Sequence, residues 1–532
     1  MNDSPSIRPR QRLALGGMCV WLLGAAAAHA AGTLTVCSEA APDGFDVTQY
    51  TSAVVSDAAG RTIYDQLLAL KRGTVEVVPA LVERWEISAD GLQYTLHLRK
   101  GVKFQTTPWF KPTRDMNADD VVFSIHRLMD RDSPWRKAAP NGFVAWDSFG
   151  LTEDVKALDK IDAMTVRFTL NQPVAPFLMS LTQFNTMSVY SAEYGAQLLK
   201  SGRLDALNSQ PVGTGPFVFR NYQKDAVLRL AAHPGYWGGA SKIDNLVFAI
   251  TPDANVRVQR LKAGECLVGA NMRAESINSL EGTDVQAPGA LGLISSFIAL
   301  NTKRPFLSDR RFREALTLAF DKKSYIQAVY NGKAQPSATF LPPTVWGHDA
   351  SLAERHDLER ARALVKATGY DGTEFAIATR IGGSIDGKRA AELMQGDWAR
   401  IGVKVRVQMM EWGELLKRSG RGDYDITFLS WVGNGDPDDF FTPILTCAAV
   451  AGGNNEPQWC DKAFDELASA ARSENDRSKR IELYRKAQRV LYDELPLIPT
   501  VYPLFFTAVN KRVKGYIDSP QASLDFRGVS LD

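Results

Sequence analysis

The sequence predicts an α/β protein built from at least two domains. A chain of 532 residues is too long to fold around a single hydrophobic core. Between about 290 and 430, segments with apolar residues at helical spacing alternate with short strand-like segments. Strands separated by helices of this length are typical of a mostly parallel α/β sheet.

The elements of this α/β region follow one another in regular order. One helix begins after Ser308, which suits an N-cap position, and a second begins at Asp357 and stops at Gly369. A third helix ends at Gly402, and a short helix covers 411–420. The predicted strands are 373–379, 403–407 and 424–431.

The first half of the chain has a different pattern. Segments 92–104 and 163–170 resemble antiparallel strands. Between them, 121–130 has helical spacing and a cap at Asn117 or Asp119. These features predict a separate unit with antiparallel strands.

An acidic loop follows the predicted strand 424–431. It reads VGNGDPDD and contains Asp436, Asp438 and Asp439. Open α/β sheets bind ligands beyond the carboxyl ends of their strands, so this loop is predicted to face a ligand. The loop lacks the alternating spacing and final glutamate of an EF-hand calcium loop, which argues against a metal site.

Residues 1–30 have the pattern of a secretory signal peptide. A basic segment precedes an apolar stretch, and small residues lead up to Ala30. We expect cleavage after Ala30 and export to the periplasm. A lipid anchor on Cys19 is disfavoured, because Met18 fills a position that requires a small residue. No later apolar stretch approaches the length of a membrane span.

The exported chain is formally neutral. Removing residues 1–30 lowers Lys+Arg from 62 to 59 and Asp+Glu from 60 to 59. The charges are mixed and form no basic stripe, so the sequence predicts no nucleic-acid partner.

The sequence also lacks a recognisable catalytic motif. It has no GxSxG nucleophile elbow and no HExxH metal motif. The histidines of the exported chain are scattered singly, which disfavours a catalytic or metal-binding cluster. The sequence therefore argues against an enzyme, and we expect no cofactor and no metal. These histidines are His97, His126, His233, His348 and His356.

Four cysteines remain after export: Cys37, Cys266, Cys447 and Cys460. An even number in an oxidising compartment favours two disulfides, for which three pairings are possible. A zinc site is the alternative, but no two of these cysteines have the close CxxC spacing that zinc usually takes. A local Cys447–Cys460 bond would add about 3 kcal/mol of stability in the chain-entropy model and leave Cys37–Cys266 as a long-range link.

Several segments along the whole exported chain resemble one family, the extracytoplasmic solute-binding proteins of peptide ABC transporters (family 5), and specifically its dipeptide-binding branch. The segment 105–123 is particularly similar to the antimicrobial-peptide transport branch. The segments that carry the resemblance are LVERWEISADGLQYTLHLRKGVKF (81–104), KPTRDMNADDVVFS (111–124), PVGTGPF (211–217), GYWGG (235–239), ITPDANVRVQRLKAGEC (250–266) and EWGELLKR (411–418).

The resemblance implies a two-lobed periplasmic binding protein of the class II type. Its ligand cleft lies between the lobes, and an extra domain is inserted in the N-terminal half. It also implies the disulfides Cys37–Cys266 and Cys447–Cys460. The implied parts are lobe I (31–63, 214–291 and 503–532), the extra domain of lobe I (64–213) and lobe II (292–502).

By the same resemblance, an aspartate pairs with the α-ammonium of a dipeptide and lies three residues after the strand-terminal tryptophan. Here that tryptophan is Trp431, the third position is Asn434, and the loop is one residue shorter than usual. Asparagine accepts a hydrogen bond but does not neutralise an ammonium. We expect Asn434 and Asp436 to reach the cleft, whereas Asp438 and Asp439 cap a turn or helix start. The alternative for Asp436 is the same capping role.

The resemblance also implies an arginine that binds the α-carboxylate of the peptide. Arg380 is the best match and Arg389 the weaker one; an exposed loop position is the alternative for Arg380. Other predicted ligand-binding residues are Thr51, Ser52 and Ala53, through backbone contacts or as an ordinary polar turn, together with Gly433, and Trp412 and Trp431 as cleft walls or simple core.

The resemblance therefore implies the substrate-binding component of a peptide-type ABC importer, which captures a small peptide by hinge closure. Its partners would be the ligand and an inner-membrane permease, and a monomer is the family expectation. Because the usual aspartate is replaced, a longer or antimicrobial peptide, haem or an opine stays open as the ligand. Nickel is disfavoured because no histidine lies near Asn434 in the sequence. A ligand-presenting chemosensory role is a further alternative.

Overall fold

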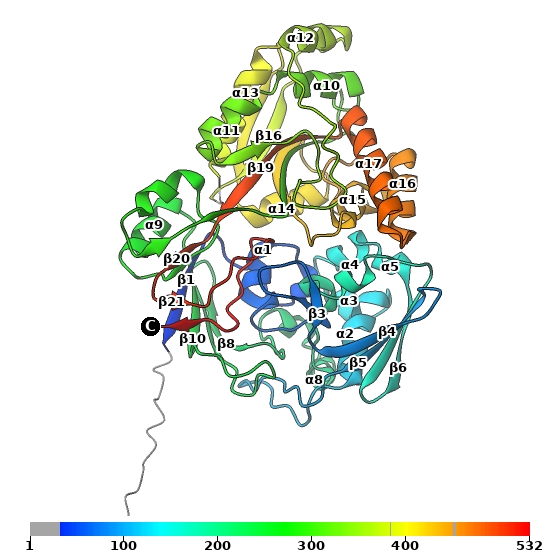
Figure 1. Cartoon of the computed structure of the whole chain (residues 1–532), viewed down its shortest axis with the longest axis vertical. Helices are drawn as coiled ribbons and strands as arrows, with labels where there is room; N and C mark the ends of the chain where they lie inside the picture. The colour runs from blue at the N-terminus through cyan, green and yellow to red at the C-terminus, as the bar shows by residue number, and fades with distance from the viewer. Residues whose placement is uncertain (1–31, 383–384, 451–453) are drawn as a thin grey trace, which may run out of the picture.

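The computed structural model describes residues 32–382, 385–450 and 454–532. The predicted signal peptide and its cleavage site lie outside these residues. Figure 1 shows two bodies stacked one above the other, with the chain passing between them. Within the described residues, no helix is long and apolar enough to cross a membrane.

The lower body in Figure 1 contains a seven-stranded sheet, built from segments that lie far apart in the sequence. Its central strand β1 pairs in parallel with β10 and β11, whereas β9, β8, β20 and β12 join in antiparallel fashion. In spatial order the strands are β12 (Val285–Gln286), β20 (Ala508–Asn510), β11 (Val268–Gly269), β1 (Thr33–Ser38), β10 (Asn245–Ile250), β9 (Val227–Ala232) and β8 (Phe217–Gln223).

A four-stranded antiparallel sheet lies beside it, as the first half of the sequence predicts. Its strands are β4 (Val82–Ile87), β5 (Gln93–Leu98), β7 (Thr165–Leu170) and β6 (Val155–Asp162). Helix α2 (Ala118–Met129) packs on this sheet and begins with a capping box between Asn117 and Asp120. One hydrophobic core runs through both sheets, so the two units fold together as lobe I. The shorter elements of this lobe are α1 (Ala53–Val55), β2 (Leu68–Leu70), β3 (Val77–Pro79), α3 (Pro134–Ala138), α4 (Val144–Ser148), α5 (Leu151–Asp154), α6 (Phe177–Ser180), α7 (Phe184–Met187), α8 (Ala192–Ser201), α9 (Ala254–Lys262), β21 (Val513–Lys514) and β22 (Ser530–Leu531).

The upper body, lobe II, contains the second seven-stranded sheet. Strand β16 pairs in parallel with β17 and β18, but β14 pairs antiparallel with both β18 and β19. The sheet is therefore mixed rather than mostly parallel. The reason is that β14 brings the chain into lobe II and β19 returns it, so the two run in opposite directions. In spatial order the strands are β13 (Gly289–Leu291), β19 (Leu497–Phe506), β14 (Ile294–Leu300), β18 (Ile426–Val432), β16 (Phe375–Arg380) and β17 (Val405–Met410), with β15 (Ala334–Pro336) paired to β19.

Helices cover both faces of this sheet, because alternate strand residues enter two separate cores. Ile298 and Leu300 of β14 join one core, and Phe297 and Ala299 join the other. The helix at Asp357 begins where the sequence predicts, whereas the one expected after Ser308 begins one residue later, at the N-cap Asp309. The helices are α10 (Arg310–Ala319), α11 (Lys322–Tyr330), α12 (Leu358–Ala367), α13 (Gly387–Ala399), α14 (Trp412–Gly420), α15 (Asp438–Leu445), α16 (Lys462–Ser473) and α17 (Arg477–Glu494).

Both predicted disulfides are present. Cys37–Cys266 connects β1 to the segment after α9, and Cys447–Cys460 closes a short loop after α15. The two-lobed α/β class is confirmed. The predicted residue boundaries of the lobes and of the extra domain stay a prediction.

Candidate functional site

A cleft lies between the two lobes and consists of two adjoining cavities of about 180 and 190 Å³. Lobe II supplies the end of β18 and helix α14, and lobe I supplies the segment around α1 and residues near 521. Because the cavities share much of their lining, we describe them as two ends of one cleft. The shared residues are Ser52, Ala53, Trp412, Leu429, Ser430, Val432 and Gln521.

Arg380 marks the cationic end of this cleft. It ends strand β16, and its guanidinium carbon lies 4.3 Å from the ring centroid of Trp412. Its Nε and Nη2 atoms are buried and have no hydrogen-bond partner among the described residues. Burial lowers the pKa of Arg380, and the nearby carboxylates of Glu39 and Glu411 oppose this effect. Arg389 instead lines a separate surface hollow, away from the cleft.

Asp439 marks the acidic end. It lies in the first turn of α15, where acidic side chains are favoured by the helix dipole. Its Oδ2 atom accepts a hydrogen bond of 2.7 Å from the backbone N–H of Asn434, while its buried Oδ1 atom has no partner among the described residues. Burial raises the pKa of Asp439 well above its usual range, and the Asn434 N–H and the Trp431 indole act in the opposite direction.

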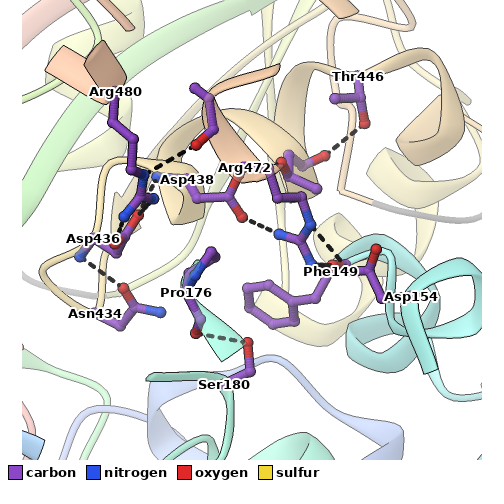
Figure 2. Close-up of polar contacts among 12 residues, drawn as sticks. Phe149, Asp154, Pro176, Ser180, Asn434, Asp436, Asp438, Thr446, Arg472 and Arg480 are labelled. Carbon is purple, nitrogen blue, oxygen red and sulfur yellow. Dashed lines mark hydrogen bonds and ion pairs between the residues drawn. The ribbon is translucent and has the colours of Figure 1, made fainter. Parts of the chain in front are cut away.

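Asn434 and Asp436, which the sequence predicts to reach the cleft, are not among its lining residues. Asp436 forms a bidentate ion pair with Arg480 of α17, at 3.0 Å to Nη1 and 2.7 Å to Nη2, and its N–H donates to the Asn434 side chain (Figure 2). It also caps the N–H of Asp438. The prediction for Asp436 is therefore corrected in favour of its capping alternative, because a buried arginine from a distant helix satisfies this carboxylate.

Asp438 belongs to a different network, which connects the lobes. Figure 2 shows Arg472 of α16 between Asp438 and Asp154, with Nε of Arg472 3.0 Å from Asp154 Oδ2. Arg472 also donates to the Phe149 carbonyl and accepts from the Ala175 N–H at 2.9 Å. Because Asp154, Phe149 and Ala175 belong to lobe I, this contact holds the lobes together.

Of the other predicted ligand-binding residues, some line the cleft and some do not. Thr51, Ser52 and Ala53 line the cleft, and the Ser52 hydroxyl caps helix α1. Trp412 lines both ends of the cleft and Trp431 only the Asp439 end. Gly433 is not a lining residue: a Cβ atom there would lie 2.1 Å from the Phe440 ring, so this glycine permits close packing behind the cleft.

Two residues that line the cleft are not predicted from the sequence to do so. The sequence predicts only a capping role for Asp439, and one of its oxygen atoms has that role. Glu456, in the short loop closed by Cys447–Cys460, was not singled out, yet it lines the Asp439 end of the cleft and is buried. Its position in a disulfide loop just after the acidic loop was the only sequence signal for it. Within the described residues, no group of three or more His, Cys, Asp or Glu side chains is arranged to hold a metal ion.

The fold and the cleft define a two-lobed ligand-binding protein. Residues 76–452 match the model of the bacterial extracellular solute-binding proteins, family 5 middle region. The chain belongs to this family, which consists of substrate-binding rather than enzymatic proteins.

Individual relatives cover nearly the whole chain. Di/tripeptide-binding protein 4 of Pseudomonas aeruginosa (strain UCBPP-PA14) is 45% identical over 514 residues, which are 95% of this chain and 96% of that protein. The dipeptide-binding protein of Pseudoalteromonas sp. SM9913 in complex with Met-Leu has a TM-score of 0.91 at 30% identity and covers 94% and 100% of the two chains. The periplasmic binding protein DppA of Helicobacter pylori in complex with the peptide STSA has a TM-score of 0.90 at 31% identity, covering 94% and 98%.

Proposed function

We propose that this protein is the periplasmic substrate-binding component of a peptide-type ABC importer and that it captures a free di- or tripeptide. The observation that carries this proposal is the charge pattern of the cleft. One end is lined by Asp439, whose Oδ1 atom has no hydrogen-bond partner in the part of the chain that the structure describes, and the other by Arg380, whose Nε and Nη2 atoms likewise have none there. A short zwitterionic peptide has the complementary charges at its two ends.

Each charge gains its partner from the ligand. The α-ammonium donates to Asp439 Oδ1, and the α-carboxylate accepts from Arg380 Nε and Nη2. A ligand that lacks one of these charges leaves a buried polar group of the protein without its partner, which weakens binding. The resulting selectivity is for both free termini of a peptide.

Hinge closure is expected because both lobes contact the ligand. Asp439 and Arg380 belong to lobe II, whereas residues 51–53 of lobe I cover the cleft from the opposite side. A peptide that contacts both lobes stabilises the closed arrangement and shifts the population toward it.

The importer cycle requires no chemistry on the ligand, so the protein is not an enzyme under this proposal. It would be exported by cleavage after Ala30, act as a monomer, and deliver the peptide to an inner-membrane permease. A chemosensory protein would bind the same ligand, and only its docking partner would differ. Similarity to relatives that are named for di- and tripeptide binding supports the importer assignment.

A thermal-shift series on the mature protein tests the proposal. Ala-Ala, N-acetyl-Ala-Ala and Ala-Ala amide are compared at equal concentration, with the Asp159→Asn variant, whose exposed side chain lies outside the cleft, as a control. A ligand at one hundred times its Kd stabilises a protein by about 2.7 kcal/mol. We expect a clear rise in Tm with the free dipeptide only. If none of the three compounds changes the Tm, peptide capture is wrong and the cleft serves another ligand class, such as haem or an opine.

A further inference from the structure

The Asp439 end of the cleft contains a second buried carboxylate, that of Glu456. The residue is 7% exposed, and its Oε2 atom is buried without a hydrogen-bond partner among the described residues. Its own backbone N–H favours the charged form, but no cationic side chain of the described residues pairs with the carboxylate. The proposed binding of the peptide termini does not use this group. Its presence in the cleft therefore requires a separate explanation.

The backbone around Glu456 is firmly held. The Asn455 side chain donates to the carbonyls of Thr446 and Trp459 at 3.0 and 2.8 Å and accepts from the Trp459 N–H at 3.1 Å. The Cys447–Cys460 disulfide closes the same loop. The hydrogen bonds of the Asn455 side chain and the disulfide thus fix the position of the Glu456 backbone.

Several other buried carboxylates of this protein have an arginine partner. Asp46 pairs with Arg127, Asp436 with Arg480, and Asp525 with Arg527. Near Glu456, by contrast, the buried Tyr424 hydroxyl also has no partner among the described residues. The arginine that lines this end of the cleft, Arg61, is engaged with Gln521 and Ser56 instead. A buried carboxylate without a charged partner is costly to ionise, so a cation supplied from outside the chain would favour its charged form.

The walls that lead to Glu456 are largely apolar and aromatic. A lysine or arginine side chain has a matching shape, because its methylene stem packs on apolar surface while its charged end pairs with a carboxylate. The aromatic rings add favourable cation–π contacts. The apolar lining residues at this end include Phe149, Phe184, Phe297, Trp412, Leu416 and Leu429.

We propose that Glu456 selects peptides whose N-terminal residue is lysine or arginine, by pairing with the cationic side chain of that residue. The inference rests on the proposed function. It assigns the N-terminal residue because Asp439, the proposed partner of the α-ammonium, lines the same end of the cleft as Glu456, whereas Arg380 lines the other end. Glu456 is thus a specificity-determining residue of the cleft.

Isothermal titration calorimetry of the mature protein with four dipeptides tests this inference. Lys-Ala is compared with norleucine-Ala, which has a similar stem but no charge, with Ala-Lys, which places the charge on the second residue, and with Ala-Ala. We expect Lys-Ala to bind at least tenfold more tightly than norleucine-Ala and Ala-Lys. In Glu456→Gln this ratio falls to near one, whereas in Asp159→Asn it is unchanged.

The outcomes separate the two proposals. If Ala-Ala binds but Lys-Ala has no advantage over norleucine-Ala, the role of Glu456 is wrong and peptide capture stands. The same conclusion follows if the Lys-Ala advantage survives in Glu456→Gln. If no dipeptide binds, both proposals fail. If Glu456→Gln does not fold, the comparison on the unmodified protein can still overturn the proposal, because a missing Lys-Ala advantage contradicts it without the variant.

Discussion

Arg472 and Asp154 form a buried ion pair that joins the two lobes, with Arg472 Nε 3.0 Å from Asp154 Oδ2. Asp438 pairs with the same guanidinium from within lobe II. The Asp154 carboxylate of lobe I therefore pairs with a cation that Asp438 also holds from within lobe II. This contact lies outside the cleft, so it stabilises the closed arrangement independently of the ligand.

The first prediction concerns this pair. Asp154→Asn removes the lobe I charge, and we expect the Kd for Ala-Ala to rise about tenfold, equivalent to about 1.4 kcal/mol. The reason is that binding must then supply the free energy of closure that the ion pair provides. Calorimetry measures the Kd, and small-angle scattering should show a larger radius of gyration. An unchanged Kd together with unchanged scattering would show that the pair does not govern closure.

The second prediction contrasts two aspartates of the same loop. Asp439→Asn keeps the hydrogen bond to the Asn434 N–H but removes the charge, so we expect free-dipeptide affinity to fall at least 30-fold, or about 2 kcal/mol. Asp436→Asn leaves Arg480 without its charged partner, so we expect the free energy of unfolding to fall by about 3 kcal/mol. Selectivity for a free peptide amine should persist in Asp436→Asn. Denaturant unfolding and calorimetry with N-acetylated peptide separate the two effects, and a reversed pattern would return Asp436 to the binding role.

The third prediction concerns the carboxylate end of the peptide. Arg380→Met keeps an unbranched stem beside Trp412 but removes the cation. We expect this variant to bind Ala-Ala and Ala-Ala amide with similar affinity, whereas the unmodified protein strongly prefers the free acid. Arg389→Met is the matched control, because Arg389 lies outside the cleft. Persistent preference for the free acid in Arg380→Met would assign carboxylate binding to another group.

The fourth prediction uses the pH dependence of stability. Burial raises the pKa of Glu456 to about 8, above its usual value near 4.5, so the folded protein holds a proton that the unfolded chain releases. Its contribution to stability is fully present below about pH 4.5 and is lost as the pH rises toward 8. Without ligand, the Tm of Glu456→Gln minus the Tm of the unmodified protein should therefore increase as the pH rises from 5 to 8. The other titratable or charged groups facing this region are Tyr424, Asp439 and Arg61, which both proteins share. A constant Tm difference over this pH range would contradict the assignment.

The local signals of the sequence predict much of the fold. The caps at Asn117 and Asp357 act between residues close in the chain, and both begin helices as expected. The antiparallel pairing of β14 with β18 and β19 was not predictable in this way, because it depends on how the chain enters and leaves lobe II. The residue pattern of a single segment does not show how the chain enters and leaves lobe II.

The site was predicted less completely for the same reason. Arg380 is the last residue of strand β16 and lines the cleft. Because the strand itself is predictable, the sequence could indicate the position of Arg380. Asp436 pairs with Arg480, which lies 44 residues further along the chain, and is therefore not free to bind a ligand. Glu456 reaches the cleft only because the Asn455 side chain and a disulfide fix its loop. Such long-range partners decide which of several acidic residues stays free for a ligand.

A crystal structure of the mature protein with bound Lys-Ala would show which side chain holds each charge of the peptide. We predict the α-ammonium of the peptide within hydrogen-bond distance of Asp439 Oδ1, its carboxylate on Arg380 Nε and Nη2, and its lysine ammonium on Glu456. A peptide that is bound in the cleft with its α-ammonium on another group, or with its carboxylate away from Arg380, would contradict the account.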